Sequence, residues 1–283
     1  MVYLIQELKS RFGEKEYTMK KTTVILIAFA LILLAGNGAL AQANPLLGET
    51  MPDFTVTTCD GDEVSLSALL AEKDLVLVNV FTSWCPPCRV EFPIMQAVYE
   101  DYADRVEIVA LSNEKSDTAD IIADYKAQLG LTFPMASATG TGVVRFAKIM
   151  SYPTTLFIDK SGKIVLYETL PFVFESQFSA AVDHFLADDC DGEPAVLFNL
   201  YVCDADGHPA PGARVSLCTD EICVPLVSSD EGVITFVGKP DDYHLQILSL
   251  PEGCSVSEGF EPLRLNEEWS LIEVEREPGC LCD

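Results

Sequence analysis

Two patterns of apolar and polar residues follow one another along the chain, and each predicts a different architecture. Between Pro45 and about Ala187, apolar runs such as "DLVLVNVF" and "VEIVALS" are typical of strands buried on both faces of a sheet. "DTADIIADYKAQLG" and "ESQFSAAVDHFLA" predict helices, and "TTLFID" with "KIVLYE" predicts a hairpin. This part of the chain therefore predicts an α/β domain with a mixed central sheet and helices on both faces.

The pattern changes near Ala195, where helical periodicity ends. Short alternating runs follow, among them "AVLFNLYVCD", "ARVSLCT", "GVITFVG" and "YHLQILSL", and they are separated by Asp, Gly and Pro. Strands at this spacing predict a small antiparallel β-sandwich. We therefore expect an α/β domain over residues 44–188, an acidic linker over 189–194 and a Cys-rich all-β sandwich domain over 195–283.

Residues 1–43 have the pattern of a secretion signal. Lys20 and Lys21 follow Met19, residues 24–34 are apolar, and Ala-Gln-Ala at 41–43 is a small-x-small cleavage site. The residues before Met19 do not fit a signal, so we expect the natural start at Met19. We predict an extracytoplasmic protein that is secreted, periplasmic or on the cell surface. An uncleaved N-terminal membrane anchor stays open, because the extended apolar run approaches a spanning length.

Charge and cysteine content narrow the partners and the compartment. The formal net charge of −26 argues against nucleic acid and anionic membrane surfaces as partners, because both repel an acidic protein. The three histidines show no metal-ligand spacing, so we predict no metal site. Ten cysteines in an exported chain indicate disulfides rather than a reducing compartment.

The stretch "FTSWCPPCRVEFP" carries the candidate chemistry. Cys85 follows a buried strand and precedes a helix, and free amides at a helix N-terminus favour a thiolate. Cys88 lies one turn further on the same face, within disulfide reach. We expect an exposed attacking sulfur on Cys85 and a shielded resolving sulfur on Cys88. The C-x-x-C spacing alone leaves a working dithiol, a structural disulfide and half of a metal site open, and its strand–helix context favours the dithiol.

The residues within and after the motif modify this chemistry. Pro86 and Pro87 have no N–H, so they remove two amides that could donate to the Cys85 sulfur and leave the amide of Cys88. A less stabilised thiolate predicts a better reductant. Glu91 lies three residues beyond Cys88 on roughly the same helical face. It is either a solvated surface residue or a carboxylate that opposes thiolate formation and shuttles a proton.

Several motifs in the same order indicate a family. "LVNVFTSWCPPCRVEFP", "FPMAS" with "SYPTTLFIDKSGKIV", and "MPDFTVTTCDGDEVSLSAL" resemble TlpA/ResA-like thiol–disulfide oxidoreductases, exported members of the thioredoxin superfamily. The resemblance implies a thioredoxin-like fold in which Cys85 attacks substrate disulfides and Cys88 resolves the mixed disulfide. It implies that Pro153 is cis and lies beside the dithiol, and that Glu91 tunes the thiols. Asn79 occupies the place of a buried Asp in thioredoxin.

The resemblance also implies a substrate surface and partners. Its expected residues flank the dithiol and the cis-proline: Trp84, Pro86, Pro87, Tyr152, Pro153 and Thr154. Tyr152 departs from the small β-branched residue that is common there, and "LYETLPFVFE" lacks the glycine often found after the last strand. The implied partners are disulfide-bearing exported proteins, apocytochrome c among them, and a membrane electron donor of the CcdA/DsbD type. No cofactor is implied beyond the redox-active disulfide itself.

The other eight cysteines suggest structural disulfides. Cys218 and Cys223 flank the short turn "TDEI", so we predict that they bond across a hairpin. Cys280 and Cys282 are poorly placed to bond each other. We expect each of them to bond a different one of four other cysteines, Cys59, Cys190, Cys203 and Cys254. The sequence leaves the pairing among these six open. Zinc bound by the terminal "CLC" with other cysteines, or a second redox relay through them, stays open.

The β-sandwich region has no catalytic constellation of its own. Its Asp-Gly and Pro-Gly turns and its "DEG" turn resemble CnaB-like or carboxypeptidase-regulatory-like modules, which implies a spacer or a binding platform. Two rivals to the reductase remain. One is a thiol peroxidase, although "NVFTSWC" lacks the proline of its motif; the other is a disulfide-stapled binding protein with a structural CPPC pair.

Overall fold

A computed structural model describes residues 44–187, 192–204, 207–219, 222–238, 243–256, 264–265 and 269–276. The predicted signal over 1–43, the linker cysteine Cys190 and the terminal Cys280 and Cys282 lie outside the described residues. Within the described segments, no helix combines the length and the apolar character needed to cross a membrane.

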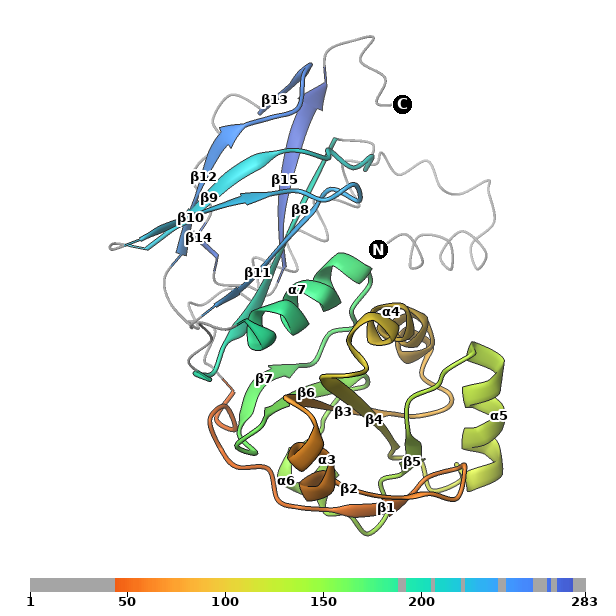
Figure 1. Ribbon diagram of the computed structural model, residues 1–283. Coiled ribbons are helices and arrows are strands. Elements are labelled where there is room, and N and C mark those ends of the chain that lie inside the picture. The colour runs from red at the N-terminus through yellow and green to blue at the C-terminus, as the bar shows by residue number, and fades with distance from the viewer. Residues whose placement is uncertain are drawn as a thin grey trace, which may run out of the picture. The chain divides into compact units, whose positions relative to one another are not determined.

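The N-terminal part is built on a five-stranded mixed sheet in the order β5-β4-β3-β6-β7 (Figure 1). Strands β3, β4 and β5 are mutually parallel, whereas β6 runs antiparallel to β3 and β7 antiparallel to β6. The strands are β3 Leu75–Phe81, β4 Val106–Ser112, β5 Met135–Ser137, β6 Thr154–Asp159 and β7 Ile164–Glu168. Every residue of β3 is buried, as its continuous apolar sequence predicts.

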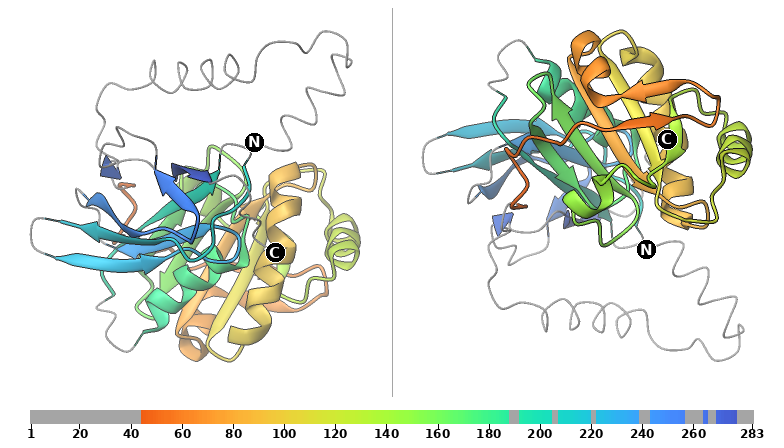
Figure 2. Two further views of the ribbon diagram at one scale, coloured as in Figure 1. Left: turned by 90° about the horizontal axis from the view of Figure 1, so that it is seen from above. Right: turned by 90° about the horizontal axis from the view of Figure 1, so that it is seen from below.

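Helices cover both faces of this sheet, as predicted (Figures 1 and 2). One apolar core contains side chains of α4, α5 and α7, and the core on the opposite face contains Leu66 of α3 and Val143 of α6. The helices are α3 Leu66–Glu72, α4 Pro86–Tyr102, α5 Ala119–Leu129, α6 Val143–Phe146 and α7 Glu175–Leu186. A short hairpin, β1 Thr55–Thr57 with β2 Glu63–Ser65, precedes them. This arrangement of a parallel unit, an antiparallel hairpin and helices on both faces is a thioredoxin-like fold.

Local sequence signals place the helix that carries the motif and the helix after β4. Helix α4 begins with Pro86 and Pro87 in its first two positions, where a missing N–H costs no intrahelical bond. Helix α5 ends at Gly130, whose φ of 65° is the left-handed conformation that glycine adopts without strain. Gly130 is the stop that the sequence predicts.

The C-terminal part consists of two four-stranded sheets, β10-β9-β12-β14 and β11-β8-β15-β13. An apolar core takes side chains from both sheets, among them Leu200 of β8, Leu217 of β9 and Leu245 of β12. The strands are β8 Val196–Asp204, β9 Arg214–Cys218, β10 Cys223–Val227, β11 Val233–Gly238, β12 Tyr243–Ser249, β13 Cys254–Val256, β14 Arg264–Leu265 and β15 Trp269–Arg276.

The expectation of an all-antiparallel sandwich is wrong in one pairing. Strand β15 pairs with β8 in parallel. A parallel pair needs a long connection, and the strands β9 to β14, as far as the structure describes this stretch, lie between β8 and β15 in the chain. Helix α7 ends at Leu186 and β8 begins at Val196, so the change of architecture falls where the sequence pattern changes. The division into domains and a linker stays a prediction.

Candidate active site

The C-x-x-C pair lies where the central strand passes into helix α4. Cys85 is the N-cap residue of α4, with φ −78° and ψ 109°, and its sulfur accepts a hydrogen bond of 3.2 Å from the amide of Cys88. Cys85 and Cys88 form a disulfide with a Cα–Cα distance of 5.4 Å. An N-cap side chain accepts from the amides of the second or third helical residue. The second residue is Pro87, so the Cys88 amide is the one left to donate.

Both sulfur-bearing residues are buried, which corrects one expectation. Cys85 exposes 3% of its surface and Cys88 none. Cys88 is the more shielded of the two residues, as predicted. The expectation that the Cys85 sulfur is exposed is wrong for this disulfide form. Both residues belong to the apolar core beneath α4, because the helix N-terminus packs against the end of the sheet. Pro86 and Pro87 are exposed, and Trp84 exposes 62% of its surface.

Glu91 is fully buried, so its interpretation as a solvated surface residue is wrong. It lies on the inward face of α4 next to Phe92 in the core. Its Oε2 accepts a 2.9 Å hydrogen bond from Asn79 Nδ2, and its Oε1 accepts a 3.2 Å bond from the amide of Phe172. Desolvation, assisted by the nearby charge of Glu168, raises the pKa of Glu91 from 4.5 to about 8, although both hydrogen bonds oppose this shift.

Asn79 connects Glu91 to the sheet. It lies in the buried strand β3, and its Nδ2 donates 2.8 Å to Thr155 Oγ1 in β6 as well as to Glu91. Its Oδ1 is buried without a hydrogen-bond partner. Rotation of the Asn79 amide would place this oxygen opposite a protonated Glu91, so the neutral acid can be accommodated.

The proline that the sequence analysis singled out lies at the start of β6. The Tyr152–Pro153 peptide bond is cis, Pro153 is buried, and the Thr154 hydroxyl donates 2.9 Å to the carbonyl of Ser151. The Tyr152 ring meets the Trp84 ring edge-on, with centroids 6.1 Å apart. The loop before Cys85 and the loop before Pro153 therefore lie side by side, as the family resemblance implies.

A third segment, which the sequence analysis missed, contacts both loops. It follows β4 and is defined here as the anchor segment, residues 113–117. Asp117 accepts 3.0 Å from the amide and 2.6 Å from the hydroxyl of Ser83. Glu114 accepts 3.0 Å from the Trp84 indole, and Asn113 donates to the Tyr152 hydroxyl. The only sequence signal was its position, because polar residues after adjacent parallel strands meet at one edge of a sheet.

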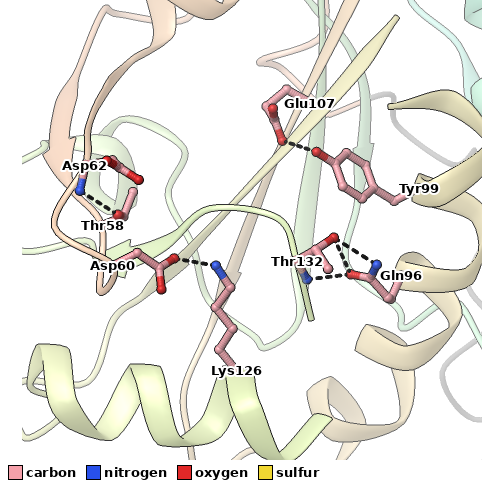
Figure 3. A network of polar contacts seen from close by, with 8 residues as sticks. All are labelled: Thr58, Asp60, Asp62, Gln96, Tyr99, Glu107, Lys126 and Thr132. Atoms are coloured by element: carbon pink, nitrogen blue, oxygen red, sulfur yellow. Dashed lines mark hydrogen bonds and ion pairs between the residues drawn. The ribbon is translucent and has the colours of Figure 1, made fainter. Parts of the chain in front are cut away.

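Two other cysteine expectations have clear outcomes. Cys218 and Cys223 form a disulfide between directly paired residues of β9 and β10. Cys59, expected among the disulfide partners, is a free thiol in the β1–β2 hairpin, and desolvation raises its pKa. The same hairpin is joined to α5 by an ion pair between Asp60 and Lys126 (Figure 3). Its backbone is also tied to β5, because the Cys59 amide donates 2.8 Å to the Met135 carbonyl.

Comparison with known proteins agrees with this geometry. Residues 47–167 match the model of the AhpC/TSA family. The chain is 31% identical over 156 residues to the thiol-disulfide oxidoreductase ResA of Bacillus thuringiensis strain Al Hakam, a match that covers 52% of this chain and 88% of the relative. It is 36% identical over 120 residues to the thioredoxin-like protein YneN of Bacillus subtilis strain 168, covering 41% of this chain and 68% of that protein.

Among solved structures, the chain is similar to a thiol:disulfide interchange protein of the thioredoxin family from Chlorobium tepidum TLS. The identity is 30%, the TM-score 0.43, and the match covers 51% of this chain and all of that one. With a C-x-x-C pair at the N-terminus of the helix after the central strand, and with this coverage of ResA, the assignment is plain. The chain belongs to the ResA-like family of thiol–disulfide oxidoreductases.

Proposed function

We propose that Cys85 and Cys88 are the redox pair and that they reduce disulfides of extracytoplasmic proteins, with apocytochrome c as one candidate client. The observation that carries this proposal is the Cys85–Cys88 disulfide at the N-cap of α4. A thiol at a helix N-terminus ionises readily and a neighbour one turn away can close the disulfide, which are the two requirements of thiol–disulfide exchange.

The reaction proceeds in two exchanges. The Cys85 thiolate attacks one sulfur of the client disulfide, the client S–S bond breaks, and a mixed disulfide forms as the first client sulfur leaves and takes up a proton. The Cys88 thiol then loses its proton and attacks the Cys85 sulfur, which releases the second client sulfur as a thiol. Two electrons pass from the pair to the client, which also takes up two protons: the one that Cys85 released when it ionised and the one from Cys88. Cys85 and Cys88 end as a disulfide.

Glu91 is proposed to handle the proton of Cys88. It lies one helical turn beyond Cys88 and, like Cys88, is fully buried. With a pKa raised to about 8, it exchanges protons near neutral pH, which is the condition for effective acid–base work. When Glu91 is ionised, its charge opposes a second negative charge on the dithiol, so a proton on Glu91 and a thiolate on the pair favour each other.

The direction of electron flow follows from the helix N-terminus. With Pro87 in the second helical position, the Cys85 sulfur keeps one amide donor, from Cys88. Fewer hydrogen bonds to the thiolate stabilise the reduced form of the pair less, so the pair gives up its electrons more readily. We propose a reductant, supplied by a membrane dithiol donor of the CcdA/DsbD type. No cofactor is involved other than the cysteine pair.

The proposed compartment and contacts rest on the sequence pattern. The signal-like residues 1–43 and the cysteine content favour an extracytoplasmic protein, released or held by an uncleaved anchor. Clients would lie against the exposed Trp84, Pro86 and Pro87 and against the Tyr152–Thr154 loop. The net charge of −26 argues against nucleic acid as a partner.

Reduction of insulin disulfides by dithiothreitol, followed by turbidity, tests the proposal. We expect the wild-type protein to accelerate the reaction and Cys85→Ser to abolish the acceleration, whereas Cys59→Ser, which removes a thiol outside the motif, stays at the wild-type rate. Equal rates for wild type and Cys85→Ser would contradict the proposal and favour a structural CPPC pair. Turnover of hydrogen peroxide faster than of insulin would favour the thiol peroxidase instead.

A further inference from the structure

Two aromatic rings join the loops on either side of the redox pair. Trp84 immediately precedes Cys85, and Tyr152 immediately precedes the cis-proline Pro153. Their ring planes are 85° apart and their centroids 6.1 Å apart, an edge-to-face contact of the kind that aromatic pairs prefer. Because each ring belongs to a different loop, their contact bridges the two loops.

Neighbouring residues of the anchor segment hold the two rings. Asn113 Nδ2 donates to the Tyr152 hydroxyl, and Glu114 Oε2 accepts 3.0 Å from the Trp84 indole N–H. The position of Asn113 is fixed in turn, because its amide donates 2.9 Å to the carbonyl of Phe81 at the end of β3. The two rings are therefore tied to one short stretch of backbone beside the central strand.

The anchor segment is itself rigidly bonded to the loop that carries the redox pair. The buried Asp117 accepts from both the amide and the hydroxyl of Ser83, and it also accepts from the hydroxyl of Ser112 at the end of β4. The Asp117 amide donates 3.0 Å to the Glu114 carbonyl, which closes a turn within the segment. The Trp84 ring itself has one hydrogen bond to this segment, from its indole N–H to Glu114, and that bond is strained or broken when the ring moves away from Tyr152.

Access to Cys85 is narrow in this arrangement. Cys85 exposes only 3% of its surface, although Trp84 beside it exposes 62%. Tyr152 packs against the apolar core that contains Cys85 and Cys88. Because Trp84 directly precedes Cys85 and its ring contacts Tyr152, the aromatic pair lies beside the residue that a client sulfur must reach.

We propose that the Trp84–Tyr152 pair is a selectivity gate, which Asn113 and Glu114 hold closed as positioning residues. The gate disfavours small disulfides, such as oxidised glutathione, that make too few contacts to replace the ring contact and its hydrogen bonds. It admits an extended polypeptide segment around a disulfide, because such a segment can pack on both rings and offset their separation. The inference rests on the proposed function, since it assigns selectivity to the same redox pair.

Tyr152→Phe and Asn113→Ala test the gate, because each removes the hydrogen bond between Asn113 and the Tyr152 hydroxyl while leaving both rings in place. The measured quantity is kcat/KM for insulin divided by kcat/KM for oxidised glutathione. We expect this ratio to fall about fivefold, the effect of one net hydrogen bond. The double variant should fall no further than either single variant, because both remove the same bond.

Tyr167→Phe is the matched control. Its half-buried hydroxyl donates 2.8 Å to the Ala147 carbonyl, so the substitution also removes one tyrosine hydrogen bond from the same domain. The control should leave the ratio unchanged. A second readout is the rate at which iodoacetamide alkylates Cys85 in the reduced protein, which should rise in Tyr152→Phe and not in Tyr167→Phe.

The outcomes separate the gate from the redox assignment. If the wild type reduces insulin through Cys85 and the ratio stays within about twofold of wild type in both gate variants, the gate is wrong and the redox pair stands. Equal losses toward both disulfides would show general damage to the site and would also overturn the gate. If the wild type shows no Cys85-dependent reduction, both proposals fall.

Discussion

The buried carboxylate of Glu91 makes the stability of the protein depend on pH in an uncommon direction. The structure raises the pKa of Glu91 from 4.5 to about 8 by desolvation. Between these two values the folded protein holds a proton on Glu91 that the unfolded chain has released. The folded state binds more protons there, so the free energy of unfolding falls as the pH rises.

The size of this effect follows from the two pKa values. The interval between 4.5 and about 8 corresponds to about 5 kcal/mol at 1.36 kcal/mol per pKa unit. This contribution is fully present below pH 4.5 and is lost as the pH passes 8. A typical domain has a total stability of about 5–15 kcal/mol, so the change is large enough to measure.

Glu91→Gln removes the titration and keeps a neutral side chain of the same shape. Like the protonated acid, glutamine has both an acceptor oxygen and a donor group, and rotation of the Asn79 amide turns its unpartnered Oδ1 toward that donor. We expect the variant to lose the fall in stability between pH 5 and pH 8.5, and to be more stable than the wild type at pH 8.5. In disulfide exchange it should be slower by about tenfold or more, because the proton shuttle is gone.

Guanidinium unfolding of the oxidised protein at pH 5, 7 and 8.5 is the measurement. Glu100→Gln is the control, because Glu100 is exposed on the same helix and a glutamine there still accepts from Gln96. The control should keep the wild-type pH dependence. Parallel pH profiles for wild type and Glu91→Gln would refute the reasoning, since they would show that Glu91 does not hold its proton up to pH 8.

Two further predictions concern the loop that carries the redox pair. Pro87→Ala restores the amide of the second helical position, which can donate to the Cys85 sulfur. The variant should raise the reduction potential by roughly 30–60 mV, the effect of one charge-assisted hydrogen bond. Pro86→Ala is the control, because the amide it restores does not reach the N-cap, and an equal rise in potential there would contradict the explanation. Asp117→Asn should lower the free energy of unfolding by about 1 kcal/mol in denaturant titration, because a neutral oxygen replaces the charged acceptor of the Ser83 and Ser112 hydrogen bonds. The exposed Asp120→Asn on α5 should change it little, and similar losses in both would argue against a special role for Asp117.

The redox pair could be placed from sequence because its signals are local. A continuous apolar run predicts β3, and prolines at the first helical positions predict where α4 begins, so the position of Cys85 between them follows. The hydrogen bond from Cys88 follows in turn, because Pro87 removes the other amide within reach. None of these steps needs to know what the helix packs against.

Glu91 shows where this reasoning stops. Its place on the same face of α4 as Cys88 could be predicted from helical spacing, but whether that face is buried depends on what packs against it. The Phe172 amide, which donates to Glu91, comes from a segment after β7 that is far away in sequence. A residue that looks like a surface glutamate in the sequence is therefore fully buried.

The anchor segment and the last strand illustrate the same limit at longer range. Asn113 and Asp117 meet the loops of the redox pair and the cis-proline because β4 lies beside β3 in parallel with fixed register. No motif encodes that register. Likewise, the short alternating runs predict strands after Ala195, but they do not state that β15 returns beside β8 in parallel.

Trapping of the mixed disulfide tests the central claim most directly. The reduced Cys88→Ala protein is mixed with oxidised insulin, and the adduct is mapped by mass spectrometry after digestion. If Cys85 is the attacking residue, the insulin chain is found on Cys85, and its yield falls to background in Cys85→Ser/Cys88→Ala. An adduct on the free thiol Cys59, or no adduct at all, would contradict the assignment of the redox pair.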